Sequence, residues 1–263
     1  MSSIPHPDRE VTFTPSEFER FQHRDLSGTT CVVFDVLRAT STMLTALGNG
    51  AKEILPVATI EQAVRLKHAD PLLLLAGERN GIRIRADLAG GTDFDLGNSP
   101  REFGRERVSG KRIAMTTTNG TRALQACKNA REILVGSLLN RVALGGYLAH
   151  TKPGRLLLVC SGTGEDAAME DALGAGALAD YLDQVLPANP GQKTGDGWRM
   201  ASSLFESAKS DICQAISQTR NGRRLAALPD LAGDLGVCAA LDQLPLVAAM
   251  NRNGEVKLIP GGR

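Results

Sequence analysis

The chain has 263 residues, of which 42% are hydrophobic, 22% charged and 4% aromatic. This composition is that of an ordinary globular protein, long enough for one large domain or for two small ones that share a cleft. Thirty basic and 29 acidic residues leave a net charge of +1. This balance and the low aromatic content argue against a nucleic-acid-binding surface.

The N-terminal segment and the cysteines predict a cytoplasmic protein. The chain does not start with a basic segment and an apolar core, so we expect no signal peptide. Its longest apolar run, residues 71–77, is far too short to cross a bilayer. Its five cysteines are odd in number and form no Cys-x-x-Cys pair, which indicates reduced, buried thiols.

Short apolar runs and helical patterns alternate along the chain. The predicted strands cover residues 29–36, 52–58, 71–77, 111–116, 131–137 and 155–160. The predicted helices cover residues 41–51, 59–69, 121–130, 140–150 and 172–185. Fully apolar strands that alternate with helices are typical of a mostly parallel sheet covered on both faces. We therefore expect a three-layer α/β fold with a mostly parallel or mixed sheet and helices on both faces.

Two stretches of the sequence resemble each other. Residues 51–58 (AKEILPVA) and 130–137 (AREILVGS) share a small-basic-acidic-Ile-Leu run, and each follows a strand, a polar loop and a short helix. We interpret this as a partial internal duplication within a single catalytic unit, residues 1–263. The duplicated α/β lobes would cover about 27–105 and 106–263. Two ordinary βαβ units with a common strand-entry sequence are the alternative.

The other segments are irregular or close the sheet. Residues 83–100 form a long loop, and loops of this length inside a domain tend to be functional or disordered. Residues 186–198 are rich in Pro and Gly, which predicts a surface loop, and another helical region follows. Asn253-Gly254 predicts a hairpin between the last two strands.

Polar residues gather where the predicted strands end, which is where parallel sheets bind ligands. The most polar end is residues 116–122, TTTNGTR, directly before a predicted helix. A helix start attracts anions through its free N–H groups, Gly120 allows close approach, and Arg122 or Arg38 can clamp oxygens bidentately. The set predicts a phosphate or sulfonate site. Helix capping and turn formation by Thr and Asn are the alternative.

Carboxylates lie at the other strand ends. Asp35 ends a strand, a costly place for a charge that has no partner. Glu170 follows Asp166 by four positions, so their side chains would share one helix face. Several oxygen ligands beside a phosphate site suit Mg²⁺. The alternative for Asp166, Glu170 and Asp171 is that they complement the dipole at a helix start.

Other chemistries fit the sequence less well. The four histidines have no ligand spacing, which argues against a zinc site, and no Walker P-loop occurs. Cys160 lacks the arginine that cysteine phosphatases have six positions on, where Asp166 stands here. Asp35 lacks the second acid of aspartate-dependent phosphatases, because Leu37 occupies that position.

The motifs occur as an ordered set. They are FDVLRATST (34–42), LAGERNG (75–81), FDLGNSP (94–100), TTTNGTRAL (116–124), VGSLLN (135–140), Glu170-Asp171, NGRRL (221–225) and VCAALD (237–242). Over roughly residues 10–260 the chain resembles the 2-phosphosulfolactate phosphatase family. The resemblance implies an α/β phosphohydrolase that uses Mg²⁺ to convert 2-phospho-3-sulfolactate to 3-sulfolactate and phosphate, a step of coenzyme M biosynthesis. Two departures, the acidic Glu165-Asp166 pair and the long 83–93 loop, can change the choice of substrate without changing the reaction.

Our hypothesis gives these residues roles. Asp35, Glu170 and Asp171 hold Mg²⁺, with Glu78 as a further candidate, and Asp35, Arg38, Thr118, Asn119 and Glu170 form the catalytic set. The predicted substrate-binding residues are Arg38, Thr40, Glu78, Arg79, Asn98, Ser99, Thr116, Thr117, Thr118, Asn119, Gly120, Thr121, Arg122, Ser161 and Gly162. Asn98 and Ser99 close over the substrate. The spacing leaves open whether water or Asp35 attacks the phosphorus.

The expected partner is a small substrate with two anionic groups, a phosphate and a sulfonate or carboxylate. We expect no nucleic-acid or membrane partner, and a homodimer. A phosphatase for another small anionic ester and a non-catalytic module that binds a phospholigand are the alternatives. The carboxylate cluster favours an enzyme, because an anion receptor has no use for acids beside its anion.

Overall fold

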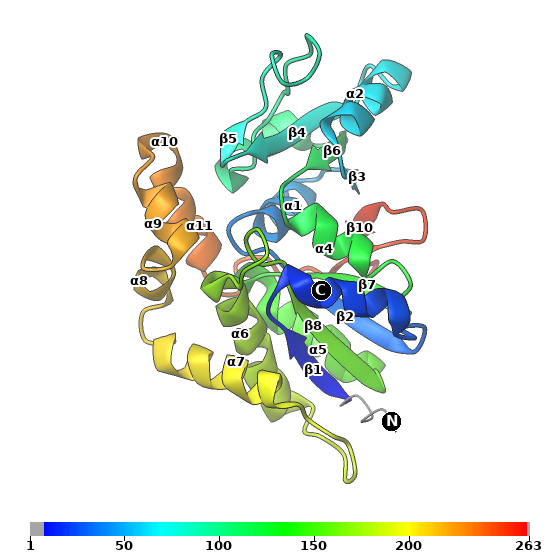
Figure 1. The fold of residues 1–263 in the computed structure, drawn as a ribbon, viewed down its shortest axis with the longest axis vertical. Coiled ribbons are helices and arrows are strands. Elements are labelled where there is room, and N and C mark those ends of the chain that lie inside the picture. The colour runs from blue at the N-terminus through cyan, green and yellow to red at the C-terminus, as the bar shows by residue number, and fades with distance from the viewer. Residues whose placement is uncertain (1–7, 262–263) are drawn as a thin grey trace.

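The computed structural model describes residues 8–261, and its ten strands form one mixed sheet (Figure 1). The strand order is β1-β8-β2-β7-β9-β10-β3-β6-β4-β5. The strands are β1 (Arg9–Thr12), β2 (Thr29–Phe34), β3 (Glu53–Pro56), β4 (Leu74–Arg79), β5 (Ile82–Arg83), β6 (Arg112–Thr116), β7 (Glu132–Gly136), β8 (Arg155–Cys160), β9 (Ala248–Met250) and β10 (Val256–Leu258). The α/β fold and the mixed, mostly parallel sheet predicted from the sequence are thus confirmed.

Helices and short 3-10 turns connect these strands. The α-helices are α1 (Ala39–Gly48), α2 (Ile60–Ala69), α3 (Arg105–Val108), α4 (Gly120–Ala126), α5 (Arg141–Thr151), α6 (Met169–Val185), α7 (Asp196–Ala208), α8 (Ile212–Ser217), α9 (Arg220–Ala226), α10 (Pro229–Ala232) and α11 (Asp234–Ala239). The 3-10 helices are η1 (Pro15–His23), η2 (Pro100–Glu102) and η3 (Leu138–Asn140). Among the described residues, no helix combines the length and the apolar character needed to span a bilayer.

The sheet consists of two parallel groups that run in opposite directions. Strands β1, β8, β2 and β7 are parallel, as are β3, β6 and β4. The antiparallel β9–β10 hairpin lies between the groups, and β10 pairs with β3 through Val256 and Ile54 alone. Figure 1 shows one group above the other, with α1 and α4 between them. The C-terminal ends of the two groups therefore do not lie along one common edge of the sheet. Residues at or just beyond the ends of β2 and β8 in one group, and of β4 and β6 in the other, nevertheless lie close together.

The chain passes between the two groups twice. It forms β2, α1, β3, α2 and β4, and later β6, α4, β7, α5 and β8. In the sheet, β2 of the first run lies between β7 and β8 of the second run. In the same way, β6 of the second run lies between β3 and β4 of the first. The strands of both runs are thus shared between the two groups, while a duplication of lobes 27–105 and 106–263 stays a prediction.

Alternating side chains divide the apolar core into layers. On β2, Val32 and Phe34 face a core built mainly with α5, α6 and α7, whereas Cys31 and Val33 face a second core with η1, α1 and α4. Strand β6 contributes to the same second core and, on its other face, to a third core with α2. Because α1 and α4 pack against both strand groups, their N-terminal ends are held where the two groups meet.

Some of the predicted element boundaries agree with the structure, and others shift for local reasons. Helix α2 begins after Thr59, whose hydroxyl accepts a hydrogen bond from the Gln62 N–H, as its sequence indicates. Strand β4 starts three residues later than predicted, because Leu74 is the first residue that pairs with β6 and Leu72 is 78% exposed. The Asn253-Gly254 hairpin is confirmed between β9 and β10. The long 83–100 segment includes the end of the short strand β5, and Ile84 and Phe94 are buried in it.

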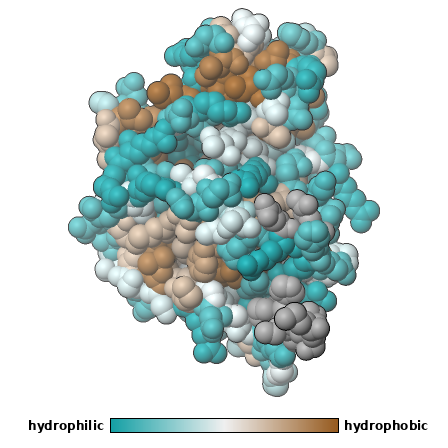
Figure 2. Space-filling model, viewed as in Figure 1, coloured by the Kyte–Doolittle hydropathy of each residue, from teal (hydrophilic) through white to brown (hydrophobic). Residues whose placement is uncertain are grey.

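The surface is divided in the same way as the fold. Figure 2 shows hydrophilic residues across the middle of this face, apolar patches at the end that contains α2, β4 and β5, and further apolar patches below the middle. In that part of the chain Leu72, Ile82 and Leu88 are exposed. The region where the two strand groups meet is therefore polar, as a site for small anions requires.

The close packing of α6 on α7 gives a stability prediction. A Cβ at Gly176 would lie 2.0 Å from the Ala201 carbonyl oxygen, whereas one at Gly146 on α5 would meet nothing within 4 Å. We expect Gly176→Ala to lower the free energy of unfolding by about 1–3 kcal/mol or more. Gly146→Ala should raise it by about 0.5–1 kcal/mol, because alanine loses less backbone entropy in a helix. Urea unfolding of both variants measures this, and an unchanged Gly176→Ala midpoint would contradict the packing.

Candidate active site

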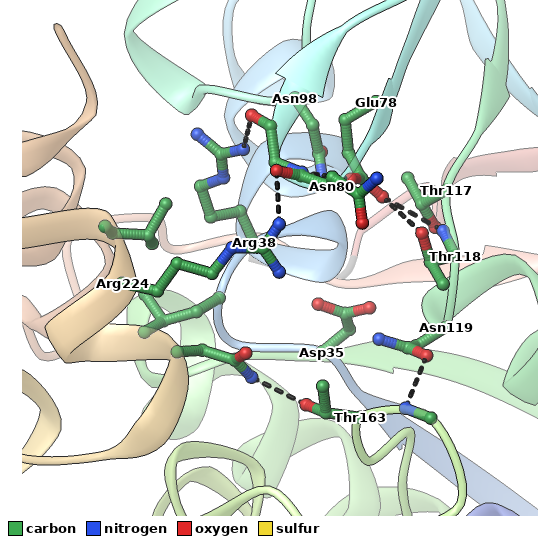
Figure 3. A pocket seen from close by; sticks show the side chains of 15 residues that line it. Asp35, Arg38, Glu78, Asn80, Asn98, Thr117, Thr118, Asn119, Thr163 and Arg224 are labelled. Atoms are coloured by element: carbon green, nitrogen blue, oxygen red, sulfur yellow. Dashed lines mark hydrogen bonds between the residues drawn. The ribbon is translucent and has the colours of Figure 1, made fainter. Parts of the chain in front are cut away.

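A cavity of about 210 Å³ opens where the two strand groups meet (Figure 3). The ends of β2, β4, β6 and β8 supply its walls, and α9 closes one side. The lining residues are Asp35, Leu37, Arg38, Glu78, Asn80, Gly81, Asn98, Thr117, Thr118, Asn119, Thr163, Gly164, Asn221, Arg224 and Leu225. Segments from almost the whole length of the chain therefore build one small polar pocket.

Asp35 lies at the floor of this pocket, one residue beyond β2. Its Oδ1 accepts a hydrogen bond from the Ala39 N–H at the start of α1 (3.0 Å). Burial raises the pKa of Asp35 to about 6, and the negative charges of Glu78 and Glu170 contribute to this shift. A Cβ at Gly120 would lie 2.7 Å from the Asp35 Oδ2, so only glycine lets the start of α4 come this close. Asp35 is thus a buried carboxylate between two helix starts.

Glu78 joins the β4 end to the β6–α4 loop. One carboxylate oxygen accepts from the Thr118 N–H and the Thr118 hydroxyl, both at 3.0 Å, and the other accepts from the Gly81 N–H (2.6 Å). A carboxylate accepts hydrogen bonds without donating them, so three donors suit this side chain at the pocket wall. The bonds also fix Thr118 next to Asn119, the residue that precedes the first turn of α4.

Two arginines face the pocket from the opposite side. Arg38 is 3% exposed, and its two terminal nitrogens donate to Asp234 (2.7 Å) and to the Gly81 carbonyl oxygen (2.8 Å). Arg224 on α9 donates to the Asn80 carbonyl oxygen. Asn80 and Gly81 form the two-residue turn between β4 and β5, with φ of 57° and 81°, as a type I′ turn requires. One tight turn therefore orients both guanidinium groups.

Asp171 accepts hydrogen bonds from the loops after β2 and β8. Its Oδ1 accepts from the Val36 N–H (2.8 Å), and its Oδ2 accepts from the Gly162 N–H (3.0 Å) and the Ser161 hydroxyl (3.1 Å). Burial and the charges of Asp35 and Glu170 raise its pKa well above the usual range. Asp171 does not line the pocket, and its bonds join the loops after β2 and β8; its role as a metal ligand stays a prediction.

Glu170 also lies behind the pocket wall. It is 2% exposed, and its Oε1 accepts from the side-chain nitrogen of Asn221, which donates to the Thr163 hydroxyl as well. Glu170 contributes to the negative charge around Asp35 without itself lining the cavity. Its catalytic role stays a prediction.

The predicted residues divide into two groups in space. Those that line the pocket are Asp35, Arg38, Glu78, Asn98, Thr117, Thr118 and Asn119. Those that lie outside its lining are Thr40, Arg79, Ser99, Thr116, Gly120, Thr121, Arg122, Ser161, Gly162, Glu170 and Asp171. Many of the second group make local bonds instead: the Thr40 hydroxyl bonds the Asp35 backbone, and Arg79 donates to the Thr116 hydroxyl. These contacts are local, but they are not helix caps, since neither α1 nor α4 has a side-chain hydrogen bond at its N-cap.

Arg122 differs from the clamp that the sequence predicts. It pairs with Glu165 (2.5 Å), and both side chains are about half exposed or more, at 46% and 63%. Arg220 pairs in the same way with Asp166 (2.9 Å). The two additional acids of the 161–166 loop thus neutralise two arginines beside the pocket, which leaves Arg38 and Arg224 as its lining arginines.

Sequence reasoning missed part of the lining. The residues absent from its site list are Leu37, Asn80, Gly81, Thr163, Gly164, Asn221, Arg224 and Leu225. The Asn80-Gly81 dipeptide is a hairpin signal that was available in the sequence. The segment NGRRL carries the family resemblance but no local sign of a pocket, because α9 is separated by many residues from every strand end in the site.

Asp35 and the acids near it are the candidate ligands of a divalent cation. Within the described residues, no group of three or more His, Cys, Asp or Glu side chains is placed to hold a metal ion by itself. Mg²⁺ nevertheless needs only one or two carboxylates, since water and substrate oxygens complete its shell. The charges of Glu78 and Glu170 make the ionised form of Asp35 unfavourable, and a bound cation would offset this repulsion. Asp35 therefore fits this requirement.

Proteins similar to this chain share one description. The family model for 2-phosphosulpholactate phosphatase matches residues 14–253. A probable 2-phosphosulfolactate phosphatase of Caldanaerobacter subterraneus subsp. tengcongensis is 35% identical over 246 residues, 93% of this chain and 96% of the relative. Proteins with the same name from Thermotoga petrophila and Thermotoga maritima are 41% identical over 199 residues and 38% identical over 221 residues. These matches cover 76% and 84% of this chain, and 79% and 88% of the relatives.

Proposed function

Because the chain belongs to the 2-phosphosulfolactate phosphatase family, we propose that it hydrolyses 2-phospho-3-sulfolactate to 3-sulfolactate and inorganic phosphate. One observation carries the proposal beyond the family name. The pocket has a buried carboxylate, Asp35, at its floor and two guanidinium groups, Arg38 and Arg224, on another side. Such a division suits a substrate with a phosphate at one end and a further anion at the other.

The size of the pocket supports a small substrate. Its volume of about 210 Å³ lies below the roughly 300–1,000 Å³ typical of ligand pockets. A three-carbon acid with a phosphate and a sulfonate is of this scale, whereas a nucleotide is much larger. The lining contains Leu37 and Leu225 but is otherwise made largely of charged and polar side chains, which suit a compact anion better than an apolar ligand.

We propose that Mg²⁺ binds at Asp35, with Glu78 or Glu170 as the second carboxylate. When bound, the ion would withdraw charge from the phosphoryl oxygens. Asp35 would be ionised in that state, since the cation compensates the charges that raise its pKa in the metal-free protein. Asp171 would act as a positioning residue, because it lies outside the pocket lining, unlike Glu78, and both of its oxygens accept bonds, from Val36, Ser161 and Gly162.

The chain's own groups would then bind and orient the ester. The Thr117 hydroxyl and the Asn119 amide nitrogen offer donors next to Asp35, where the phosphoryl group would lie, whereas Thr118 already donates to Glu78 and orients this loop. Donors aimed at the place where charge develops lower the barrier to phosphoryl transfer. In the reaction a water oxygen forms a bond to phosphorus, the ester P–O bond breaks, and one water proton ends on the C2 hydroxyl of sulfolactate.

Phosphate release from racemic phosphosulfolactate, with Mg²⁺ and with EDTA, tests this function. We expect release with Mg²⁺ and a loss of at least about a hundredfold with EDTA, since the metal supplies several kcal/mol of charge stabilisation. Phospholactate, which lacks the sulfonate, should be hydrolysed more slowly. Full activity in EDTA would remove the metal from the mechanism, and equal rates on both esters would point to another small phosphate ester as substrate. Binding without turnover would indicate a binding module.

A further inference from the structure

Asp234 is a fully buried carboxylate that contacts the pocket only through another residue. It begins α11 and is 0% exposed. Its Oδ2 accepts from Arg38 (2.7 Å), and its Oδ1 accepts from the Ser99 hydroxyl (2.6 Å). Asp234 does not line the pocket, whereas Arg38 does. No local pattern singles out this aspartate, since 196 positions separate it from Arg38.

These bonds leave Arg38 with one defined orientation. One terminal nitrogen is bound to Asp234 and the other to the Gly81 carbonyl oxygen. A guanidinium has five N–H donors in a rigid plane, so two bonds at its end leave other donors free for a ligand. Because Arg38 is only 3% exposed, the direction of these donors depends on its two partners rather than on solvent.

Asp234 also fixes the neighbouring wall of the pocket. Ser99, which it binds, is adjacent to Asn98, and Asn98 lines the pocket with 5% of its surface exposed. The Asn98 side-chain oxygen is buried and has no hydrogen-bond partner within the described part of the protein. An unpaired buried amide oxygen costs free energy unless water or a hydroxyl group of a ligand donates to it, whereas an anion, which only accepts hydrogen bonds, would bind the amide nitrogen of the same side chain. One carboxylate thus holds both Arg38 and the segment that presents Asn98.

We propose that Asp234 is a positioning residue that aligns Arg38 and Asn98 as the receptor for the non-reacting end of the substrate. This inference rests on the proposed function and assigns one side of its pocket. The phosphoryl group would lie on the side of Asp35, Thr118 and Asn119. The sulfonate or carboxylate of the same substrate would lie on the side that Asp234 organises.

A purely structural role for Asp234 makes a different prediction. A variant that only loosens the fold would weaken the binding of every ligand in the pocket. A variant that misplaces Arg38 should weaken ligands with the non-reacting anions and spare those with phosphate alone. The two product molecules separate these cases, since 3-sulfolactate carries the non-reacting groups and inorganic phosphate carries the reacting one.

The test is calorimetric binding of 3-sulfolactate and of inorganic phosphate, with Mg²⁺, to wild type and Asp234→Asn. Asparagine keeps the shape of the side chain but has one acceptor oxygen, so either Arg38 or Ser99 loses its partner. We expect the Kd for 3-sulfolactate to rise at least about tenfold and the Kd for phosphate to change less than about threefold. In the kinetics this corresponds to a raised KM with a much smaller change in kcat.

Four further variants keep the result interpretable. Arg38→Met should weaken 3-sulfolactate as Asp234→Asn does, and the double variant should add little, because the two residues act as one unit. Ser99→Ala keeps the ion pair and gives a milder loss if Asp234→Asn does not fold. Glu53→Gln removes another carboxylate, 3% exposed and paired with Arg112 and Lys257, and should leave both Kd values unchanged.

The outcomes distinguish this inference from the proposed function. Equal losses for both ligands, or no loss for 3-sulfolactate, would overturn the role of Asp234. Wild type that binds no 3-sulfolactate would overturn it as well. Wild type that binds 3-sulfolactate but does not hydrolyse the phosphate ester would contradict the proposed function, while the binding comparison would still decide the role of Asp234.

Discussion

Asp35→Asn is expected to lower the rate of phosphate release by at least about a thousandfold without loss of the fold. The side-chain oxygen of the new asparagine can still accept the hydrogen bond that Ala39 donates to Asp35, so the turn before α1 should persist. The variant removes the one pocket-floor carboxylate, which we propose as a magnesium ligand. We therefore expect weaker Mg²⁺ binding together with the loss of activity.

The same substitution should stabilise the metal-free protein at neutral pH. Burial and the charges of Glu78 and Glu170 raise the pKa of Asp35 from 3.8 to about 6 in the folded state. The folded protein therefore binds more protons than the unfolded chain between pH 3.8 and 6, and stability falls as pH rises through this window. Above pH 6, the ionised Asp35 lowers the free energy of unfolding by about 3 kcal/mol, at 1.36 kcal/mol per pKa unit. An uncharged asparagine avoids this loss.

Activity assays and urea unfolding in EDTA at pH 4 and pH 7.5 measure both effects. The stability gain of Asp35→Asn over wild type should be large at pH 7.5 and small at pH 4. Asp87→Asn, an exposed aspartate in the 83–100 segment, is the control and should change neither activity nor stability. An Asp35→Asn enzyme with near wild-type turnover would show that the reacting group lies elsewhere.

Arg224→Ala is expected to raise KM roughly ten- to hundredfold, the usual effect of losing a charged hydrogen bond. Arg224 lines the pocket from α9 and is held by the Asn80 carbonyl oxygen. It is exposed, so its removal should leave the free energy of unfolding nearly unchanged. The change in kcat should be small if the arginine binds the end of the substrate that does not react.

Arg223 provides the matched control for this experiment. It precedes Arg224 on the same helix and is also exposed, but it donates to the Gln218 carbonyl oxygen and does not line the pocket. Arg223→Ala should keep KM within about twofold of wild type. Equal effects of the two substitutions would mean that the charge of α9 acts at long range, and the assignment of Arg224 to the pocket would then be wrong.

The polar strand ends were visible in the sequence because their signals are local. An apolar run that stops at Asp35, and another that stops before Thr117, Thr118 and Asn119, mark the ends of β2 and β6 wherever the strands lie. All four residues line the pocket. The boundaries of β8 and the hairpin between β9 and β10 were predictable for the same reason, since periodicity and turn chemistry depend on neighbours along the chain.

The partner of each charged side chain could not be predicted in this way. Arg122 looks like an anion clamp in the sequence, but Glu165 pairs with it across 43 positions. Asp171 looks like a metal ligand, but the loops after β2 and β8 both donate to it. Whether a charge binds a ligand or a neighbour depends on distances in space, which no local pattern contains.

The sequence by itself determined the fold class, the polar strand ends and the family of this protein. Only the tertiary structure decided that the two parallel groups run in opposite directions, and that α9 and α11 supply Arg224 and the buried partner of Arg38. Strand formation depends on residues a few positions apart. The pocket instead depends on how the β9–β10 hairpin and the shared α1–α4 core bring the two groups together, which is a property of the packed chain as a whole.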